Sequence, residues 1–191
     1  MSLAPHKPLL IGLTGLAGSG KSTVANMLAD EFAFSELALA DPILEMLCTL
    51  FQTAGVDQAW AVERALKEQP TLLGYSYRHL AQTLGTEWGR SLAEDFWLRV
   101  LQLRLQQPEL EGENTVISDV RFPNEAQFIL DRGGCVVRVL RRPEDMPPAP
   151  VRPHASEAFS AQLPVTTELL NFGSKETLFD QVDRLVQHLR A

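Results

Sequence analysis

The feature that most constrains this 191-residue chain is a glycine-rich octapeptide near its start, GLAGSGKS at residues 15–22. It fits the pattern G-x-x-x-x-G-K-S without a gap. An uncharged apolar run at residues 9–14 favours a buried strand before it, and Val24, Leu28 and Phe32 follow with helical spacing. Between a strand and a helix, glycines let the backbone curl so that N–H groups and the helix dipole face an anion. The sequence therefore predicts a phosphate-binding loop.

Two side chains of the octapeptide suit a nucleoside triphosphate and its metal ion. Lys21 can bridge the β- and γ-phosphates as a point charge, and the Ser22 hydroxyl can bind Mg²⁺. We therefore expect ATP and Mg²⁺, although the loop alone does not distinguish ATP from GTP. Asn171 could read the adenine edge, or serve only as a turn residue before Gly173. The residues of the loop expected to hold the donor nucleotide are Gly15, Ala17, Gly18, Ser19, Gly20, Lys21, Ser22 and Thr23.

Strand and helix patterns alternate along the rest of the chain. Further strands are predicted by the apolar runs at residues 34–40, 115–119, 135–140 and 165–170. Helices are expected after the loop, from Pro42, from Pro123 to the glycine pair at 133–134, and after Ser174. This alternation predicts a three-layer α/β/α fold with a mostly parallel five-stranded sheet. We expect a single P-loop domain over residues 1–191.

Residues 42–107 are interpreted as a helical flap for a second substrate. Residues 53–75 carry scattered glycine and proline, and we expect a helical hairpin or flap there. A helix should then continue towards Gly85. The capping-box spacing in SLAE at residues 91–94 predicts that another helix opens there and runs to about residue 107.

A second insertion, at residues 141–158, is interpreted as a short mobile lid. Five prolines lie between Pro143 and Pro153. Proline removes a backbone donor and fixes φ, so we expect no regular structure in that interval. A lid of this kind could close over the bound phosphates during transfer.

Composition restricts the classes of partner. The formal net charge of −7 disfavours a nucleic-acid polymer, because such contacts depend on Lys and Arg at phosphates. Cys48 and Cys135 lie far apart with no metal-ligand spacing, which suits two buried thiols in a reducing compartment. The sequence lacks an apolar run of 18 residues, and residues 1–8 lack a signal-peptide layout. We expect a cytoplasmic protein without membrane contact, and leave a homodimer open.

A carboxylate near Mg²⁺ is expected at the carboxyl end of a strand next to the loop. Asp119 ends the run TVISD and is the natural candidate, although it could instead cap a helix or form a strand-end ion pair. Arg121 lies two residues on, near the same edge of the sheet. It could hold a substrate phosphate through two parallel hydrogen bonds, or instead pair with Glu125.

Several stretches of sequence together carry a family resemblance. They are GLTGLAGSGKS at 12–22, ADP at 40–42, LGTEWGR at 84–90, ISDVRFPNEA at 117–126, HASE at 154–157 and, more weakly, NFGS at 171–174. In this order they resemble the phage-type deoxynucleoside monophosphate kinases, a group of P-loop nucleoside-monophosphate kinases. The first stretch is specific to P-loop proteins, and the fourth with its two neighbours points to this family. Residues 53–75 and 143–153 match no named motif.

The resemblance implies transfer of the ATP γ-phosphate to a deoxynucleoside monophosphate, which gives a diphosphate and ADP. The attacking group would be a phosphate oxygen, which is largely ionised near neutral pH because its second pKa is roughly 6. No strong general base is then required. Catalysis should rest on positioning and on neutralisation of charge.

Five residues are candidates for binding the acceptor. Asp41 could orient the acceptor or a metal-bound water, or merely cap the helix at Pro42. Arg78 and Arg90 could grip the acceptor phosphate together with Arg121, or lie on solvated helix faces. Trp88 could stack on a base, or belong to a partly buried core.

Arginines near the proline-rich segment are candidates for the lid. Arg142 or Arg152 could close over the transferring phosphate, an effect worth roughly 10³-fold in rate, or be ordinary surface charges. His154, Ser156 and Glu157 could form a hydrogen-bonded corner at the base of the lid. The candidates for catalytic roles are thus Lys21, Asp41, Arg121 and Arg142.

Two other functions stay open on the sequence alone. One is a P-loop kinase of another small metabolite, resembling dephospho-coenzyme A kinase. The other is a nucleotide-binding switch without an acceptor, which should bind ATP but show no acceptor-dependent turnover.

Overall fold

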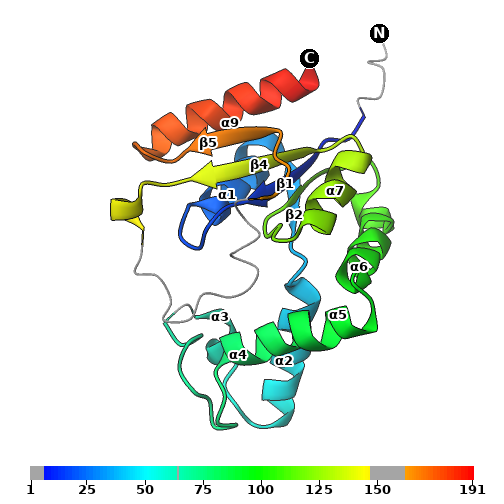
Figure 1. The fold of residues 1–191 in the computed structure, drawn as a ribbon, viewed down its shortest axis with the longest axis vertical. Helices are drawn as coiled ribbons and strands as arrows, with labels where there is room; N and C mark the ends of the chain where they lie inside the picture. The colour runs from blue at the N-terminus through cyan, green and yellow to red at the C-terminus, as the bar shows by residue number, and fades with distance from the viewer. Residues whose placement is uncertain (1–6, 64, 147–161) are drawn as a thin grey trace. The chain divides into compact units, whose positions relative to one another are not determined.

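The structure is a computed structural model that describes residues 7–63, 65–146 and 162–191. The chain folds into two compact units (Figure 1). The sheet unit comprises Met1–Ala38 and Arg104–Ala191, and the helical unit comprises Leu39–Leu103. Among the described residues, none of the helices is long and apolar enough to cross a membrane.

The sheet unit is built on five parallel strands, as predicted. They are β1 (Leu10–Thr14), β2 (Phe34–Leu37), β3 (Asn114–Ile117), β4 (Cys135–Leu140) and β5 (Thr167–Leu170). Their order across the sheet is β2-β3-β1-β4-β5. β1 therefore lies between β3 and β4, and Gly12 is in register with Ile117 on one side and Val136 on the other. The carboxyl ends of these three strands meet at one edge, where ligands bind in open α/β sheets.

Alternation along β1 explains how both faces of the sheet are covered. Ile11 and Leu13 are fully buried in the main hydrophobic core. Gly12 points to the other face, where a β-carbon would lie 2.3 Å from Cδ1 of Ile129. A glycine at this position lets the helix that carries Ile129 approach the strand closely.

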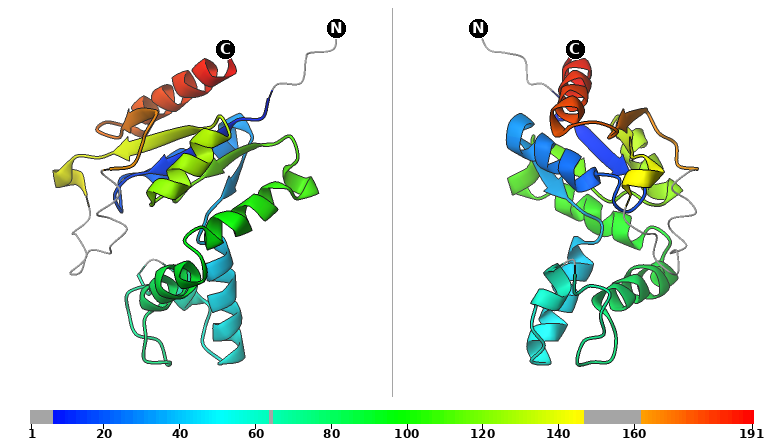
Figure 2. Two further views of the ribbon diagram at one scale, coloured as in Figure 1. Left: turned by 45° about the vertical axis from the view of Figure 1, so that its right-hand side comes forward. Right: turned by 90° about the vertical axis from the view of Figure 1, so that its left-hand side faces the viewer.

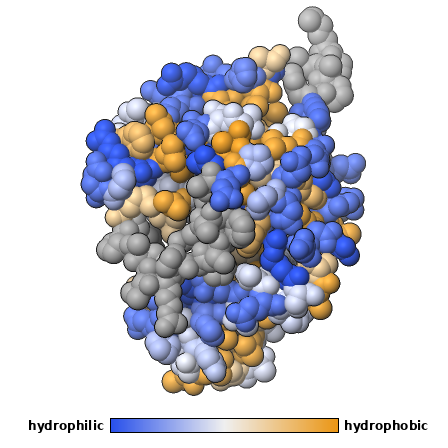
Figure 3. All heavy atoms as spheres, viewed as in Figure 1, coloured by the Kyte–Doolittle hydropathy of each residue, from blue (hydrophilic) through white to orange (hydrophobic). Residues whose placement is uncertain are grey.

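Three long helices cover the two faces of the sheet (Figures 1 and 2). They are α1 (Lys21–Phe32), α7 (Pro123–Asp131) and α9 (Lys175–Arg190). Val24, Leu28, Leu178 and Val182 from α1 and α9 share one core with β1 and β4, while α7 packs on the opposite face. The outer side of α9, at the top of Figure 3, is mostly hydrophilic. The fold is thus the predicted α/β/α arrangement.

The helical unit is built from helices joined by turns. They are α2 (Asp41–Thr53), α3 (Ala59–Val62), α4 (Tyr77–Gln82), the π-helix η1 (Thr83–Trp88), α5 (Gly89–Leu92) and most of α6 (Phe96–Leu105). Leu47 and Phe51 of α2 are buried, as their spacing predicted. The Trp97 indole N–H donates to the Gly85 carbonyl at 2.7 Å. That hydrogen bond fixes the π-helical turn against α6.

Two helix boundaries in this unit were predicted wrongly. The helix does not end near Gly85 but continues through η1 and α5 to Leu92. Ser91 opens no helix, because it lies inside α5 and its hydroxyl donates to the Trp88 carbonyl at 2.7 Å. α6 begins only at Phe96.

Three irregular segments also differ from the predictions. Among the residues that the structure describes between 53 and 75, the single helical turn α3 replaces the predicted helical hairpin, while the alternative of a flap stays a prediction. The segment leads to an antiparallel bridge between Pro70 and Ser76. β2 ends at Leu37 rather than at residue 40. The proline-rich interval starts with a 3-10 turn, η3 (Pro143–Asp145), because proline fits the first position of such a turn. A second 3-10 turn, η2, spans Pro108–Leu110.

Candidate active site

The loop between β1 and α1 is curled by glycines in conformations that other residues rarely adopt. Gly15, Gly18 and Gly20 have φ angles of +136°, +82° and +109°. The Ser19 N–H donates to the Leu16 carbonyl at 3.1 Å, which closes the loop on itself. The loop thus has the concave backbone shape that binds phosphate.

Close packing as well as φ demands glycine at two of these positions. A β-carbon on Gly15 would lie 2.4 Å from the Val139 carbonyl oxygen, which belongs to β4. A β-carbon on Gly20 would lie 2.4 Å from Nδ2 of Asn171. The loop is therefore seated directly against the ends of β4 and β5.

Lys21 begins α1 and reaches back over the loop. Its ammonium group donates to the carbonyl oxygens of Gly15 at 2.7 Å and Leu16 at 2.9 Å. This geometry holds one positive charge at the mouth of the loop. On entry of a phosphate, the same ammonium can exchange carbonyl oxygens for the more strongly attracting phosphate oxygens.

Two hydroxyl groups at the loop are buried. The Oγ1 atom of Thr14 and the Oγ atom of Ser19 have no hydrogen-bond partner among the residues that the structure describes. Both side chains are almost fully buried, at 0% and 1% exposure. Buried hydroxyls without a partner are rare in folded proteins, so these two are an unusual feature of the loop region.

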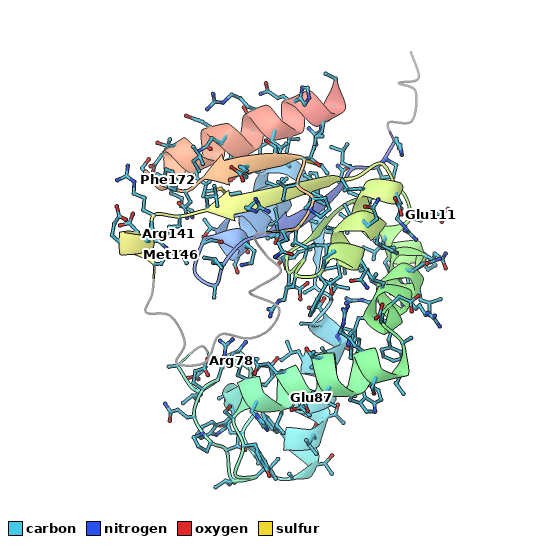
Figure 4. The ribbon with its side chains drawn as sticks, in the orientation of Figure 1. Arg78, Glu87, Glu111, Arg141, Met146 and Phe172 are labelled. Atoms are coloured by element: carbon cyan, nitrogen blue, oxygen red, sulfur yellow. The ribbon has the colours of Figure 1, made fainter. Side chains whose placement is uncertain are left out.

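Two side chains from the ends of the neighbouring strands contact the outer side of the loop. Arg141, which follows β4, donates to the Gly18 carbonyl at 3.3 Å. Asn171, which follows β5, donates through Nδ2 to the Ser19 carbonyl at 2.9 Å. Figure 4 shows Arg141 and Phe172 together beyond the carboxyl ends of these strands. The sequence did not predict either contact, because each joins residues more than 120 positions apart.

The segment after β3 lies beside the end of β1. The Val120 N–H donates to the Leu13 carbonyl at 3.0 Å, which places Asp119 and Arg121 at the edge from which the loop emerges. The Glu125 carboxylate, a buried group, accepts from the backbone N–H groups of Arg121 at 2.7 Å and Phe122 at 3.0 Å. Glu125 thus caps α7 through the backbone.

Ser22 and Asp119 carry oxygen atoms of the kind that Mg²⁺ binds. Ser22 is the second residue of α1, and Asp119 is half-buried at the end of β3. Mg²⁺ in phosphate-transfer sites is bound through one or two protein oxygens together with substrate phosphates and water. A hydroxyl and a carboxylate on segments that leave neighbouring strands fit that requirement.

A cavity of about 780 Å³ adjoins the loop within the sheet unit. Its walls come from α1, the ends of β4 and β5, and the start of α9, including Thr23, Asn26, Arg141, Asn171 and Lys175. That volume is in the range of small-molecule sites. The cavity can hold a group attached to phosphates in the loop.

Arg142 lies close to an aromatic ring. Its guanidinium carbon is 5.6 Å from the centre of the Phe172 ring, within cation–π range. Arg142 is exposed, and it directly precedes η3. The other lid candidates, Arg152 and the group His154, Ser156 and Glu157, lie outside the described residues.

The remaining predicted acceptor residues belong to the helical unit. Asp41 is the first residue of α2, and Ala40 is the N-cap, so Asp41 itself does not cap the helix. Arg90 lies on α5. Arg78 on α4 forms an ion pair with Glu68 (Figure 4 labels Arg78).

Trp88 is enclosed by other aromatic side chains, although it stays 42% exposed. Its ring is 5.6 Å from that of Phe96, edge to face, and 6.2 Å from that of Trp97. This packing matches the alternative of a partly buried aromatic. The exposed part still leaves room for stacking on a base.

Lys67 is a cationic residue near Arg78 that the sequence did not single out. Its ammonium lies 5.0 Å from the centre of the Tyr77 ring, and its carbonyl accepts from the Arg78 N–H at 3.0 Å. Burial and the positive charge of Arg78 lower the pKa of Lys67. Arg78 already pairs with Glu68, so these two cations alone do not indicate an anionic ligand. No local signal in the sequence indicates that Lys67 and Arg78 are neighbours. They are brought together by the turn that the Pro70–Ser76 bridge closes, and that turn was not predicted.

The chain is similar to viral kinases over most of its length. A deoxynucleotide monophosphate kinase of Acanthamoeba polyphaga mimivirus is 34% identical over 145 residues, which cover 70% of this chain and 74% of that protein. The deoxynucleoside-5'-monophosphate kinase of Escherichia phage T5 is 27% identical over 227 aligned positions, which cover 85% of this chain and 89% of that protein. No protein-family model matches the sequence.

Solved structures support the fold. Shikimate kinase from Bacteroides thetaiotaomicron has a TM-score of 0.50 at 16% identity, covering 96% of this chain and 99% of that one. Shikimate kinase from Aquifex aeolicus has a TM-score of 0.50 at 14% identity, and the match covers 95% of this chain and 98% of that one. At such low identity the likeness concerns the fold alone, which is that of the P-loop kinases.

Proposed function

The chain belongs to the deoxynucleotide monophosphate kinase family, and from this we propose that it transfers the γ-phosphate of ATP to a deoxynucleoside monophosphate. The products would be ADP and a deoxynucleoside diphosphate. That it is a phosphotransferase follows from its family. The observation that carries the proposal is the curled loop under the Lys21 ammonium, with the Asp119–Arg121 segment joined to the adjacent strand end.

The donor would lie in the sheet unit. The loop residues Gly15, Ala17, Gly18, Ser19 and Gly20 would surround the β-phosphate with backbone N–H groups, and Lys21 would contact the β- and γ-phosphates. The nucleoside of ATP would occupy the adjoining cavity of about 780 Å³, which Thr23 and Asn171 help to line. The cavity lining is mixed in charge, which suits an uncharged nucleoside better than phosphate. It contains the cations Arg141 and Lys175 beside the carboxylates Asp30, Glu31, Glu176 and Asp180.

Ser22 and Asp119 would hold Mg²⁺. When bound, the ion would neutralise charge on the β- and γ-phosphate oxygens. Lys21 would add a second positive charge on the same oxygens. The chain's own contribution is to fix these two charges relative to the loop before transfer begins.

The acceptor would be held by cations and one carboxylate. Arg121 would bind the acceptor phosphate, Arg78 and Arg90 would add charge, and Trp88 would contact the base. Asp41 would orient the acceptor. Its phosphate oxygen would attack without a general base, because it is largely ionised near neutral pH with a pKa of roughly 6. Specificity would then reside in the base and sugar contacts.

Arg142 would act during transfer. Its guanidinium, now 5.6 Å from the Phe172 ring, is on a flexible side chain that can turn towards the phosphates. A cation added to the equatorial oxygens can raise the rate by roughly 10³-fold. Closure around the reactants would also exclude water and limit hydrolysis of ATP.

A panel of acceptors tests the proposal directly. ADP release is followed in a coupled assay with ATP, Mg²⁺ and each of the four deoxynucleoside monophosphates, with the ribonucleotides, shikimate and dephospho-coenzyme A as comparison acceptors. At least one deoxynucleotide should raise the rate far above that with ATP alone. Stimulation only by another metabolite would identify a different kinase, and no stimulation by any acceptor would defeat the proposal.

A further inference from the structure

Asn171 is fastened both to the sheet and to the phosphate loop. Its backbone N–H donates to the Leu140 carbonyl at 2.8 Å, which extends the pairing of β4 with β5 by one residue. Its side-chain Nδ2 donates to the Ser19 carbonyl at 2.9 Å. A single residue thereby joins the rigid end of the sheet to the part of the loop that precedes Lys21.

The peptide that Asn171 contacts is one that a phosphate would use. The Ser19 carbonyl and the Gly20 N–H belong to the same planar peptide group, so fixing the oxygen fixes the direction of the N–H. Gly20 is the N-cap of α1, and its backbone is at φ +109°. A hydrogen bond to a carbonyl also polarises the N–H of that peptide and strengthens it as a donor.

The packing around Gly20 is shaped to the Asn171 amide. A β-carbon on Gly20 would lie 2.4 Å from Nδ2 and 3.4 Å from the amide carbon of Asn171. The amide therefore occupies the space that a side chain at position 20 would need. Arg141 makes a parallel contact with the preceding peptide, through its hydrogen bond to the Gly18 carbonyl at 3.3 Å.

We propose that Asn171 is a positioning residue for the phosphate loop, which it holds with the Gly20 N–H directed at the phosphates of the donor. The inference rests on the proposed function in one respect, the identity of the anion as the polyphosphate of ATP. It differs from the expectation that Asn171 reads the adenine edge, because one of its two amide N–H groups is engaged by the Ser19 carbonyl, which fixes the orientation of the amide.

A purely structural role is the main alternative, and the chain offers a matched control for it. Gln181 of α9 joins its side-chain amide to the same strand end. It accepts from the Leu170 N–H at 2.9 Å and donates to the Leu170 carbonyl at 3.0 Å. Within the part of the chain that the structure describes, none of its hydrogen bonds reaches a loop residue. Loss of Gln181 loosens the neighbourhood of Asn171 without loss of a contact to the loop.

The experiment separates phosphate binding from base binding in the full chain. Mg²⁺–tripolyphosphate, adenosine and ATP are each titrated into the wild type and the variants N171A, N171D and Q181A, with binding followed by calorimetry. N171D is nearly isosteric but replaces the donor with an oxygen that repels the Ser19 carbonyl. Thermal unfolding of each variant confirms that it is folded at the temperature of the titration.

If Asn171 positions the loop, its substitution should weaken the binding of phosphate groups more than the binding of the base. N171A should bind tripolyphosphate and ATP about ten-fold more weakly, and N171D more weakly still, since one lost hydrogen bond has about this effect. Because Asn171 also borders the cavity proposed for the nucleoside, adenosine binding should weaken by a smaller factor than tripolyphosphate binding in N171A and N171D, and Q181A should bind all three probes normally.

Two results would overturn the inference. Weaker adenosine binding by N171A with unchanged tripolyphosphate binding would assign Asn171 to the base. Equal losses of tripolyphosphate binding in N171A and Q181A would mean that Asn171 only stabilises the turn after β5. Because the titrations need no acceptor, they are independent of the acceptor panel: a protein that shows the predicted selective loss but no acceptor-dependent turnover would retain this inference while the proposed reaction failed.

Discussion

The phosphate loop and the acceptor candidates of the helical unit are held in different ways. Around the loop, the sheet supplies the support: Gly15 is packed against the Val139 carbonyl, and Val120 is bonded to Leu13. In the helical unit, side chains of the turn at residues 65–68 contact α4, as in the Arg78–Glu68 ion pair and the Lys67–Tyr77 contact. Backbone support fixes geometry more firmly than exposed side-chain pairs do.

On the proposed function, this difference would correspond to the two ligands, the donor and the acceptor. The polyphosphate of the donor is the same in every turnover, so a rigid backbone cradle suits it. The acceptor differs in its base, and adjustable side chains on short helices can accommodate such variation. We therefore expect changes at the loop to abolish transfer, and changes in the helical unit to alter which acceptor is used.

The largest effect should follow from Lys21→Ala. Removing the ammonium leaves the β- and γ-phosphate charges without their main protein cation, so the rate of transfer should fall by roughly 10³-fold or more. The thermal midpoint of unfolding should change little. The control is Lys7→Ala, which removes a lysine at the amino end of β1, at the opposite edge of the sheet. Normal turnover of K21A would remove Lys21 from the site.

Substitutions at two glycines compare the backbone of the phosphate loop with that of the helical unit. Gly15→Ala should destabilise the protein by about 2–4 kcal/mol, because φ is +136° and the new β-carbon would meet the Val139 carbonyl at 2.4 Å. Gly74→Ala in the helical unit should cost only about 1 kcal/mol, since φ is +81° but nothing lies within 4 Å. Denaturant unfolding of both variants measures the difference. Equal losses in the free energy of unfolding would contradict the claim that the loop is packed against the sheet.

The sequence predicted the sheet unit well, for identifiable reasons. Each strand is a short apolar run bounded by turn residues, and the loop motif lies between the first strand and a helix with clear spacing. The last helix was correctly predicted to follow Ser174, whose hydroxyl caps α9 by accepting from the Thr177 N–H at 3.3 Å. These are local signals, and the parallel topology follows from their alternation.

The sequence failed where a distant contact overrides a local signal. Gly85 was taken as a helix end, but its carbonyl is bonded to the Trp97 indole twelve residues later, and the helix continues as a π-helix. Ser91 matched a capping box, yet its hydroxyl is bonded within α5. The contacts of Arg141 and Asn171 with the loop likewise depend on the assembled sheet. Periodicity carries no information on such pairs.

Arg121→Ala should have an intermediate effect that is confined to the acceptor. Loss of one charge-assisted contact to phosphate should raise the acceptor KM by roughly 10- to 100-fold, and by a similar factor for every deoxynucleotide, because all share the phosphate. The KM for ATP should stay within about two-fold. Steady-state kinetics with each substrate varied in turn measures both constants. An unchanged acceptor KM would exclude Arg121 from the acceptor site.

The smallest effect should come from Lys67→Met, as a change in pH dependence. Burial and the charge of Arg78 lower the pKa of Lys67 below its ordinary value of 10.5, so the unfolded chain binds this proton more tightly. The free energy of unfolding should therefore gain a contribution as pH rises from the lowered pKa to about 10.5. K67M should lack this contribution. Identical pH profiles of the wild type and K67M would contradict the assigned environment of Lys67.

The fate of the labelled γ-phosphate of ATP tests the central claim most directly. The wild-type protein is incubated with γ-labelled ATP, Mg²⁺ and the deoxynucleotide that stimulates it most, and the products are separated. The account predicts that label appears in the deoxynucleoside diphosphate in equal amount to the ADP formed. Label found only in inorganic phosphate, or release of ADP that does not depend on the acceptor, would contradict it.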